Sequence, residues 1–186
     1  IQAYLYQTGQ WDPAAENSFV PALCNRIDRN TGGIVIAAKT AEALRIINQK
    51  IRDREIKKYY LCIVHGAMSP PSGRLEGYIF KDAAKKQVYV RSEQSKGAKT
   101  AVTKYKTLSV INGLSLVECE LVTGRTHQIR AQFSHAGHPL LGDGKYGSEE
   151  QRKKYRQKYQ ALYSYKTVFA FTSPAGELDY LNWRQF

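Results

Sequence analysis

The sequence predicts an α+β protein with a large mixed, mostly antiparallel sheet flanked by a few helices. Three observations support this fold class. Segments rich in Tyr, Ile and Val follow one another between residues 57 and 122, as strands do. The connections between them are short, and Asn112-Gly113 is a strong hairpin signal. Helical spacing of apolar residues, by contrast, is confined to a few stretches.

The first part of the chain is expected to contain one strand and one helix. Residues 1–22 have no clear period and are interpreted as irregular. The apolar run at 33–39 follows a glycine pair and suits a buried strand. Thr40 can cap the next helix, and apolar residues at helical spacing place that helix at about 41–54.

Strands connected by short turns are expected in the middle of the chain. The first ends at Gly66, and the prolines and glycine that follow force a turn. The expected strands are at about 57–65, 75–80, 86–91, 100–108 and 114–122.

Helical signals return in the last third of the chain. Gly137 can end one helix in the left-handed conformation. Ser148 and Gln151 are spaced as a capping box, which begins another helix. The expected helices span 126–136 and 148–160, and a late strand is expected at 166–172.

The composition favours a single globular domain with a polyanionic partner. The chain has 186 residues, 28 Lys+Arg and 16 Asp+Glu, which gives a formal net charge of +12 at pH 7. Phosphate contacts dominate nucleic-acid affinity, so this excess favours a nucleic-acid partner over a merely soluble basic protein. No apolar run approaches the roughly 18 residues that a membrane span requires, so no membrane partner is expected. Three widely spaced cysteines exclude a disulfide scaffold and favour a reducing, cytoplasmic environment.

Several common chemistries find no support in the sequence. It contains no GxxxxGK(S/T), HExxH, CxxC or GxSxG pattern, which argues against a P-loop, the usual zinc sites and a hydrolase elbow. His135 and His138 are close together, but Gly137 and Pro139 place them in a loop. We therefore expect a structural or surface pair there rather than a metal site.

Two polar segments stand out against this background. NRIDRNTGG at 25–33 places one carboxylate, Asp28, between Arg26 and Arg29 in a loop before the expected buried strand. Such loops often carry catalytic groups, although a solvated ion-pair loop has the same composition. TGRTHQIR at 123–130 puts two arginines, a histidine and a glutamine at the start of a helix, where either an anion or solvent can satisfy them.

Together and in this order, the two segments resemble motifs of the RluA family of pseudouridine synthases, which act on ribosomal RNA and tRNA. A third stretch, KKYYLCIVHG at 57–66, resembles another motif of that family. The last motif continues through GHPLLGDGKYG to Gly147, and the match covers most of 22–175. The resemblance implies the pseudouridine synthase fold, an active-site cleft across the sheet, and isomerisation of uridine to pseudouridine.

The resemblance also implies three catalytic residues. Asp28 matches the family's catalytic aspartate, which either attacks C1′ of the ribose or acts through a glycal route. Arg130, the last arginine of its motif, matches the counterion that grips this carboxylate. Tyr60 matches the active-site tyrosine, whose ring can pack on uracil and whose hydroxyl can reach C5. The reaction involves no redox change and no transfer to water, so neither a cofactor nor a metal is expected.

RNA contacts are expected from basic residues of the same motifs and of the helix at 148–160. Arg26 resembles the residue that enters the RNA in place of the flipped base. The other expected RNA-binding residues are Arg29, Lys58, Arg125, His127 and Lys153. Further residues expected to follow the RNA backbone are Lys85, Lys86, Lys96, Lys99, Arg152, Lys154, Arg156 and Lys158.

The sequence departs from the family pattern in a few places. Asn25 stands where the first motif usually has His, and Leu162-Tyr163-Ser164 stands where the late strand usually has Leu-His-Ala. The usual opening strand and an N-terminal S4-type RNA-binding domain are missing, so residues 1–186 are expected to be a catalytic domain without its first strand or strands. We expect a monomer that acts on structured RNA, with ribosomal RNA favoured and tRNA left open. The alternatives are an inactive RNA-binding or ribosome-assembly module and, more distantly, a nucleoside hydrolase.

Overall fold

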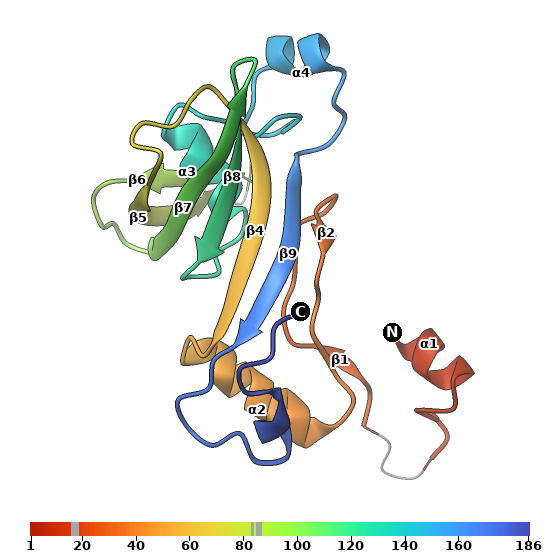
Figure 1. Ribbon diagram of the computed structural model, residues 1–186. Helices are drawn as coiled ribbons and strands as arrows, with labels where there is room; N and C mark the ends of the chain where they lie inside the picture. Colours follow the sequence, from red (N-terminus) through yellow and green to blue (C-terminus); the bar gives the residue numbers. More distant parts are fainter. Residues whose placement is uncertain (16–18, 83, 85–86) are drawn as a thin grey trace. The chain divides into compact units, whose positions relative to one another are not determined.

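The structure is a computed structural model that describes residues 1–15, 19–82, 84 and 87–186, apart from the side chain of Arg152 (Figure 1). The chain forms two compact units. The smaller unit comprises 1–27, 34–57 and 167–186, and the larger unit comprises 28–33 and 58–166. Lys85 and Lys86, which are among the residues expected to follow RNA, lie outside the described residues.

The smaller unit packs two helical segments around an aliphatic and aromatic core. Helix α2 spans Ala41–Arg52, which confirms the predicted helix. Its N-cap is Thr40, whose hydroxyl accepts a hydrogen bond from the backbone N–H of Ala43. The 3-10 helix η1 spans Gly176–Leu181. The buried core residues are Ile46, Ile47, Ile56, Phe169, Phe171, Ala175 and Leu178.

A buried ion pair joins the end of α2 to the segment near residue 172. Lys50 Nζ lies 2.7 Å from Glu55 Oε2, and the two side chains are only 3% and 8% exposed. Lys50 also donates to the Ser173 hydroxyl, while Glu55 accepts hydrogen bonds from the hydroxyls of Thr172 and Ser173. The hydrogen bond from Lys50, followed by that from Thr172, lowers the pKa of Glu55 to about 2.

The prediction that residues 1–22 are irregular is wrong at the start of the chain. Helix α1 forms over Gln2–Gln7, and only its Leu5 is buried. A single buried apolar position produces no helical period in the sequence, which explains why the pattern did not reveal this helix.

The apolar run at 33–39 is not the single buried strand that was predicted. Its beginning, β2 (Gly32–Gly33), pairs parallel with β9 (Leu162–Phe169). Its end, β3 (Ala37–Ala38), pairs antiparallel with β1 (Ala22–Leu23) in a separate two-stranded sheet. The run is therefore divided between two sheets.

The larger unit is built on a seven-stranded sheet with strand order β2-β9-β4-β8-β7-β5-β6 (Figure 1). The pairs β4–β8, β8–β7, β7–β5 and β5–β6 are antiparallel, whereas β2 and β9 are parallel. The predicted fold class, a mixed and mostly antiparallel sheet with few helices, is confirmed. The strand bounds are Ile56–His65 for β4, Ser72–Asp82 for β5, Gln87–Arg91 for β6, Lys99–Ile111 for β7 and Leu114–Leu121 for β8.

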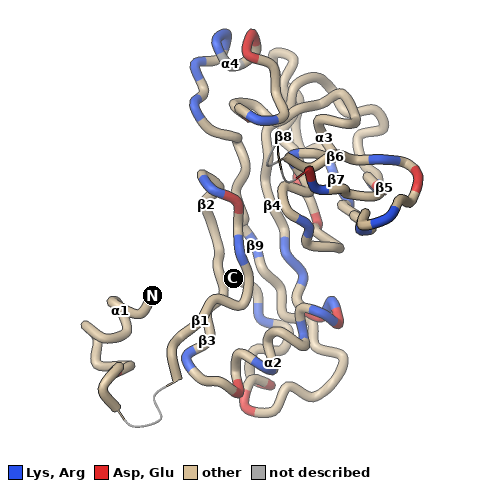
Figure 2. The backbone as a smooth tube through the Cα atoms, turned by 180° about the vertical axis from the view of Figure 1, so that it is seen from behind, with Lys and Arg blue, Asp and Glu red and all other residues tan. Residues whose placement is uncertain are grey.

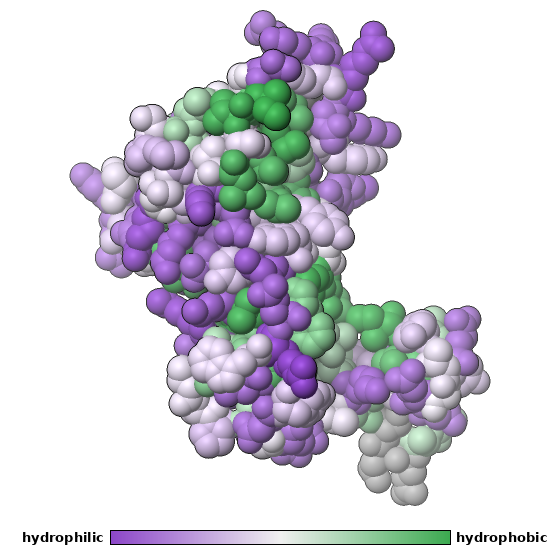
Figure 3. All heavy atoms as spheres, in the orientation of Figure 1, coloured by the Kyte–Doolittle hydropathy of each residue, from purple (hydrophilic) through white to green (hydrophobic). Residues whose placement is uncertain are grey.

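The hairpin between β7 and β8 forms where it was predicted. Asn112 and Gly113 both have positive φ, 52° and 76°, as a two-residue type I′ turn requires. Near this turn the end of β7 leaves Leu108, Val110 and Ile111 exposed. Apolar side chains gather over this part of the larger unit in Figure 3.

Helix α3, Gln128–His135, packs on β5, β6 and β7. Ile129 and Phe133 are buried, as predicted from their spacing. The helix also buries Gln132, whose amide donates to the carbonyls of Leu75 and Ala101. These hydrogen bonds are formed only when Gln132 lies opposite Leu75 and Ala101. They therefore hold α3 in one position on the sheet.

The last third of the chain differs from the prediction in two boundaries. Helix α4 spans Glu149–Tyr155, and the predicted capping box of Ser148 and Gln151 is present. The helix does not reach 160, because Arg156 adopts the left-handed conformation with φ 50°. The late strand β9 begins at Leu162, earlier than predicted. Among the described residues, no helix is long and apolar enough to cross a membrane.

Candidate active site

Asp28 lies in a tight loop immediately before β2. The backbone N–H of Thr31 donates to the Asp28 carbonyl at 3.0 Å, and Asn30 between them has a positive φ of 65°. Gln160 anchors the loop, since its amide donates to the Arg29 carbonyl at 2.7 Å and to the Thr31 hydroxyl at 3.2 Å. The Asp28 side chain is 18% exposed. The loop therefore presents a carboxylate that is largely sheltered and still reachable.

Gly33 allows this loop to lie directly against β9. A Cβ atom at Gly33 would fall 2.1 Å from the Ser164 carbonyl oxygen, and the φ of 112° is one that only glycine adopts readily. This close approach joins the Asp28 loop to the strand that carries Ser164. Gly33 therefore allows two backbone segments to lie in direct contact.

Arg130, on the first turns of α3, bridges two aspartates. Its Nη1 donates to Asp28 Oδ2 at 3.2 Å. Its Nε and Nη2 donate to the two oxygens of Asp143 at 2.7 and 2.9 Å. The Arg130 side chain is 8% exposed and that of Asp143 is fully buried. One edge of the guanidinium is thus occupied by a two-point contact, and a nitrogen on the other side is directed at Asp28.

Asp143 is prepared for this contact by the loop that contains it. The backbone N–H groups of Lys145 and Tyr146 both donate to Asp143 Oδ1, at 2.9 and 3.1 Å. Burial raises the pKa of Asp143, but the hydrogen bonds and charge of Arg130 outweigh it, and the net pKa is lowered. The same contacts raise the pKa of Arg130 against the effect of its burial. Both groups are therefore charged at neutral pH.

Tyr60, on β4, is 5% exposed and lies close to Asp28. Burial is the main cause that raises its pKa, and the negative charge of Asp28 adds to the rise. The Ser164 side chain on β9 opposes both effects. The structure thus brings the three residues implied as catalytic into one neighbourhood, although their sequence positions span about a hundred residues.

His127 and Tyr146 form a second layer beside Arg130. His127 precedes α3 with a positive φ of 51°, and its Nδ1 lies 2.9 Å from the Tyr146 hydroxyl. That hydroxyl already accepts a hydrogen bond from the backbone N–H of Val88, and its pKa is raised by burial to about 12. The phenol therefore keeps a proton that it can donate to Nδ1 of His127. Arg130 Cζ lies 5.2 Å from the Tyr146 ring centroid, which adds a cation–π contact.

His127 is held neutral in this position. Burial lowers its pKa, and the positive charges of Arg130 and Lys145 lower it further, against the opposing charges of the two aspartates. With Nδ1 accepting from Tyr146, the remaining proton belongs on Nε2. His127 thus offers a hydrogen-bond donor rather than a positive charge to an RNA.

The other residues expected to bind RNA are placed as follows. Lys58 is half-buried, and burial lowers its pKa. Its ammonium lies next to Gly124, where an added Cβ atom would be 3.9 Å from Nζ. Arg125 is exposed and donates to the Thr100 carbonyl, and Arg29 is exposed. Lys153 is exposed and pairs with Glu149 at 3.0 Å. Arg26 is exposed and belongs to the smaller unit.

Basic residues also mark α4 and the chain just after it (Figure 2). Those with described side chains are Lys153, Lys154, Arg156 and Lys158, all exposed. Lys96 and Lys99 are exposed on a different part of the larger unit, next to the start of β7. The arrangement gives a positive surface at α4, consistent with an anionic partner.

Sequence reasoning missed Asp143, Tyr146, Gln160 and Ser164. Asp143 lies inside the GDGKYG stretch, and an acid between two glycines is a signal for a functional loop. The pattern does not indicate that Asp143 pairs with Arg130. Gln160 was placed inside a helix, but α4 ends at Tyr155, and Gln160 lies in the segment before β9, from which it anchors the Asp28 loop.

Two human proteins of known structure share this fold. The structure of human RNA pseudouridylate synthase domain containing 1 has a TM-score of 0.72 and 23% identity, and the match covers 83% of this chain and 66% of that one. Human RNA pseudouridylate synthase domain containing 4 has a TM-score of 0.71 and 22% identity, with 90% and 72% covered. At these identities the likeness establishes the fold.

Sequence relatives give the family. An uncharacterized RNA pseudouridine synthase of Bacillus subtilis, YlyB, is 34% identical over 83% of this chain and 48% of its own length. The ribosomal large subunit pseudouridine synthase C of Escherichia coli is 30% identical over 82% and 48%, and synthase D of Zymomonas mobilis is 35% identical over 70% and 41%. The chain thus spans about half the length of the curated relatives it matches. The pattern of the RNA pseudouridylate synthase family matches residues 2–135, most of the chain, and this protein belongs to that family.

Proposed function

We propose that this protein isomerises uridines in structured RNA to pseudouridine, with Asp28, Arg130 and Tyr60 as the catalytic residues. The observation that carries the proposal is that Arg130 binds two aspartates through different nitrogens. Asp143 occupies one edge of the guanidinium, and Nη1 is left for Asp28 at 3.2 Å. A carboxylate held by a buried cation and still 18% exposed is suited to react with a substrate that covers it.

The reaction requires one bond to break and another to form at the same carbon. The N1–C1′ bond of the uridine breaks, the uracil turns, and C5 bonds to C1′. A proton leaves C5, and N1 ends with a proton, so no redox partner or external group is consumed. Asp28 either attacks C1′ or stabilises the positive charge that develops there and removes the 2′ proton. In both routes Arg130 stabilises the negative carboxylate through its charge.

A single carboxylate suits this chemistry better than the pair found in glycosidases. Glycosidases use a second carboxylate to activate water or to assist the leaving group. Activated water would release free uracil here. Asp143, the other nearby carboxylate, is fully buried and has both oxygens committed to Arg130 and to backbone N–H groups. Because it is fully buried and both oxygens already accept hydrogen bonds, it is not placed to activate a water molecule.

Tyr60 enters the reaction with its proton in place, because its pKa is raised. Its ring is available to pack on uracil. For its hydroxyl to take the proton from C5, its own proton must pass to an acceptor. Asp28 is the carboxylate close enough for its charge to act on Tyr60. We propose that the C5 proton is relayed through Tyr60 to Asp28. N1 gains a proton and Asp28 gives one up, so that the carboxylate is ionised again and no net proton is consumed.

Ribosomal RNA is the substrate class that we favour. The relatives from Escherichia coli and Zymomonas mobilis are named as synthases of the large ribosomal subunit. The net charge of +12 and the basic surface at α4 support a large polyanionic substrate.

Pseudouridine-specific chemical labelling tests the proposal. Unmodified large-subunit ribosomal RNA and tRNA are incubated with the protein and with Asp28→Asn, and labelled sites are located. New label in the ribosomal RNA with the wild type, and none with Asp28→Asn, is the expected result. RNA binding without label would instead indicate an inactive binding module, and release of free uracil would indicate a nucleoside hydrolase.

A further inference from the structure

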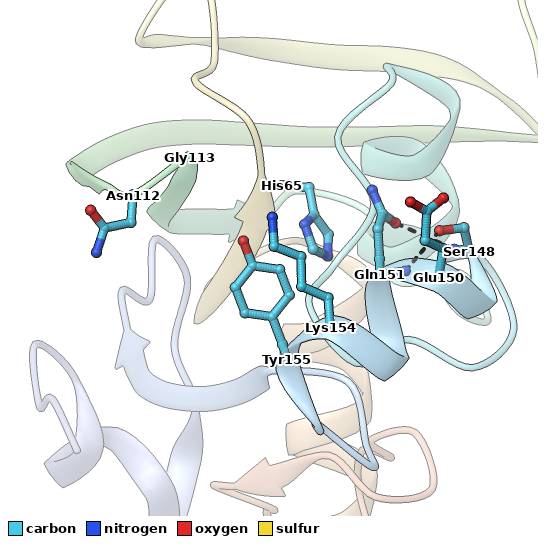
Figure 4. Close-up of a pocket in the computed structure, with 8 residues that line it drawn as sticks. All are labelled: His65, Asn112, Gly113, Ser148, Glu150, Gln151, Lys154 and Tyr155. Atoms are coloured by element: carbon cyan, nitrogen blue, oxygen red, sulfur yellow. Dashed lines mark hydrogen bonds between the residues drawn. The ribbon is translucent and has the colours of Figure 1, made fainter.

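A hollow in the larger unit lies where three elements meet (Figure 4). Its volume is about 400 Å³, within the range of about 300–1,000 Å³ typical of small-ligand sites. Its lining comes from the end of β4, the turn between β7 and β8, and helix α4. The lining residues are His65, Asn112, Gly113, Ser148, Glu150, Gln151, Lys154 and Tyr155. None of the proposed catalytic residues contributes to it.

Part of this lining is structural. Ser148 and Gln151 are occupied with each other in the capping box of α4, as the dashed lines in Figure 4 show. Gly113 belongs to the hairpin turn. The groups left for a ligand are therefore the aromatic rings of His65 and Tyr155, the ammonium of Lys154, the amide of Asn112 and the carboxylate of Glu150.

The two rings lie next to each other at an angle, with a positive charge close by. The ring centroids of His65 and Tyr155 lie 5.5 Å apart with an interplanar angle of 58°. Lys154 Nζ lies 5.4 Å from the Tyr155 ring centroid. Burial, and then the charge of Lys154, lower the pKa of His65, so its imidazole is neutral at pH 7. Among the described residues, neither ring nitrogen of His65 makes a hydrogen bond.

The wall opposite Tyr155 offers a polar side chain that can hydrogen-bond the edge of a base. The side-chain amide of Asn112 makes no hydrogen bond within the described part of the chain, and it stands across the hollow from Tyr155 in Figure 4. An amide presents both a donor and an acceptor, which matches the N–H and C=O groups of uracil. On the α4 side of the hollow, Glu150 can accept a hydrogen bond from a base N–H.

This combination of groups is the one that binds an unpaired nucleotide. Proteins hold single-stranded RNA by stacking bases on aromatic rings, by cations near the phosphates and by side chains that hydrogen-bond base edges. Lys153, Arg156 and Lys158 continue the positive surface beside the hollow. A free phosphate would need cations alone and would gain nothing from the rings or the amide.

We propose that this hollow binds one unpaired nucleotide of the RNA substrate, outside the uridine that is modified. The base stacks against Tyr155 with the tilted His65 ring beside it, Asn112 contacts its edge, and Lys154 holds the adjoining phosphate. We call this place the nucleotide hollow. The proposal rests on the proposed function only in that the substrate is RNA, since the site takes no part in the chemistry.

Equilibrium binding of a short fluorescent oligouridylate tests the nucleotide hollow. The measurements use the Asp28→Asn background, so that no chemistry occurs. Tyr155→Leu keeps the bulk of the side chain and removes its aromatic face, and should weaken binding about tenfold. Tyr155→Phe should restore the affinity. Tyr159→Leu is the matched control, because Tyr159 is 45% exposed, lies 5.5 Å from Lys158 Nζ and is not part of the hollow.

Asn112→Gly gives a test that does not depend on α4. Glycine accepts the positive φ of the turn, so the hairpin is kept while the amide is lost. Loss of one hydrogen bond to a base should weaken binding about fivefold. Equal affinities for Tyr155→Leu and Tyr159→Leu, or wild-type affinity for Asn112→Gly, would overturn the proposal.

These outcomes are separate from those of the proposed function. If the wild type makes no pseudouridine but the Tyr155 and Asn112 variants lose binding as expected, the function is wrong and the nucleotide hollow stands. If pseudouridine forms and these variants bind like the wild type, the nucleotide hollow is wrong and the function stands.

Discussion

The two units each bury an ion pair, and the two pairs are built differently. In the smaller unit, Lys50 and Glu55 are 3% and 8% exposed, and their further hydrogen bonds are made with the hydroxyls of Thr172 and Ser173 and with the Ser173 carbonyl. Nothing is left for a ligand. This pair holds α2 against the chain near residue 172 and has a structural role.

In the larger unit the cation is shared unequally. Asp143 takes two hydrogen bonds from Arg130 and is fully buried, whereas Asp28 takes one at 3.2 Å and is 18% exposed. Among the described residues, Asp28 Oδ1 makes no hydrogen bond. The comparison shows how a fold can stabilise a buried arginine with one aspartate and leave a second aspartate partly exposed.

After replacement of Asp28 itself, the largest effect in this comparison is expected from Asp143→Asn. Asparagine keeps the size of the side chain but loses the charge that pins Arg130. A small displacement of a positioned group can cost about a hundredfold in rate, and we expect a loss of that order in single-turnover pseudouridine formation at saturating RNA. RNA affinity should stay near wild type, because Asp143 is out of reach of the RNA. An unchanged saturated rate would show that Asp143 does not position Arg130 for the reaction.

Lys50→Met should damage stability and spare chemistry. It leaves Glu55 buried without its cation, which should lower the free energy of unfolding in urea by about 2 kcal/mol. Lys104→Met is the matched control, since Lys104 pairs with Glu120 at 3.4 Å with side chains 50% and 25% exposed. Exposed pairs contribute less than about 1 kcal/mol. The rate per folded molecule should be unchanged in both variants, and a drop specific to Lys50→Met would break the distinction drawn between the two units.

Binding and chemistry should also separate among the basic residues. Arg26→Ala should slow the reaction even at saturating RNA, because unstacking the target costs a few kcal/mol that an inserted side chain helps to offset. Changing Lys153, Lys154 and Lys158 together to Gln should weaken RNA binding and flatten its salt dependence, because fewer counterions are released. The reaction rate of this triple variant at saturating RNA should change little.

Single-turnover rates and binding curves at two salt concentrations measure both halves. If Arg26→Ala changes only the affinity, or the lysine variant changes only the saturated rate, the assignment of these residues is wrong.

The smallest effect is a pH dependence that belongs to the Lys50–Glu55 pair. The pKa of Glu55 is lowered from 4.5 to about 2 in the folded protein. A lowered acid pKa stabilises the fold above the unfolded value, and this contribution is lost as the pH falls towards the folded value. The stability difference between wild type and Glu55→Gln should therefore shrink between pH 4.5 and pH 2. A difference that stays constant over that window would show that the charge of Glu55 does not contribute.

The sequence predicted the elements whose signals are local. Thr40 as an N-cap, Asn112-Gly113 as a type I′ turn and the capping box of Ser148 all form, because each depends on residues a few positions apart. The end of α4 was missed because Arg156 adopts a left-handed conformation, which is not expected of an arginine from the sequence. The run at 33–39 was misread because pairing with β9 and β1 divides it, and pairing is not local.

The site was predicted in the same uneven way. The contact between Asp28 and Arg130, 102 residues apart, came from the resemblance of whole motifs and not from any period in the sequence. Asp143 carries the stronger contact with Arg130 and was not selected, because an aspartate in a glycine-rich loop does not indicate which arginine it meets. Long-range partners of this kind depend on how α3 and the loop after it pack.

The account depends most on Asp28 being a reactive group and not a structural one. Asp28→Asn tests this by measuring the single-turnover rate of pseudouridine formation and the free energy of unfolding on the same preparation. The rate should fall on the order of a thousandfold or more. Stability should change by less than about 1 kcal/mol, because Asp143 still neutralises Arg130 and the asparagine amide can still accept its hydrogen bond. Near-normal turnover, or a stability loss as large as that of Lys50→Met with the rate per folded molecule preserved, would contradict the account.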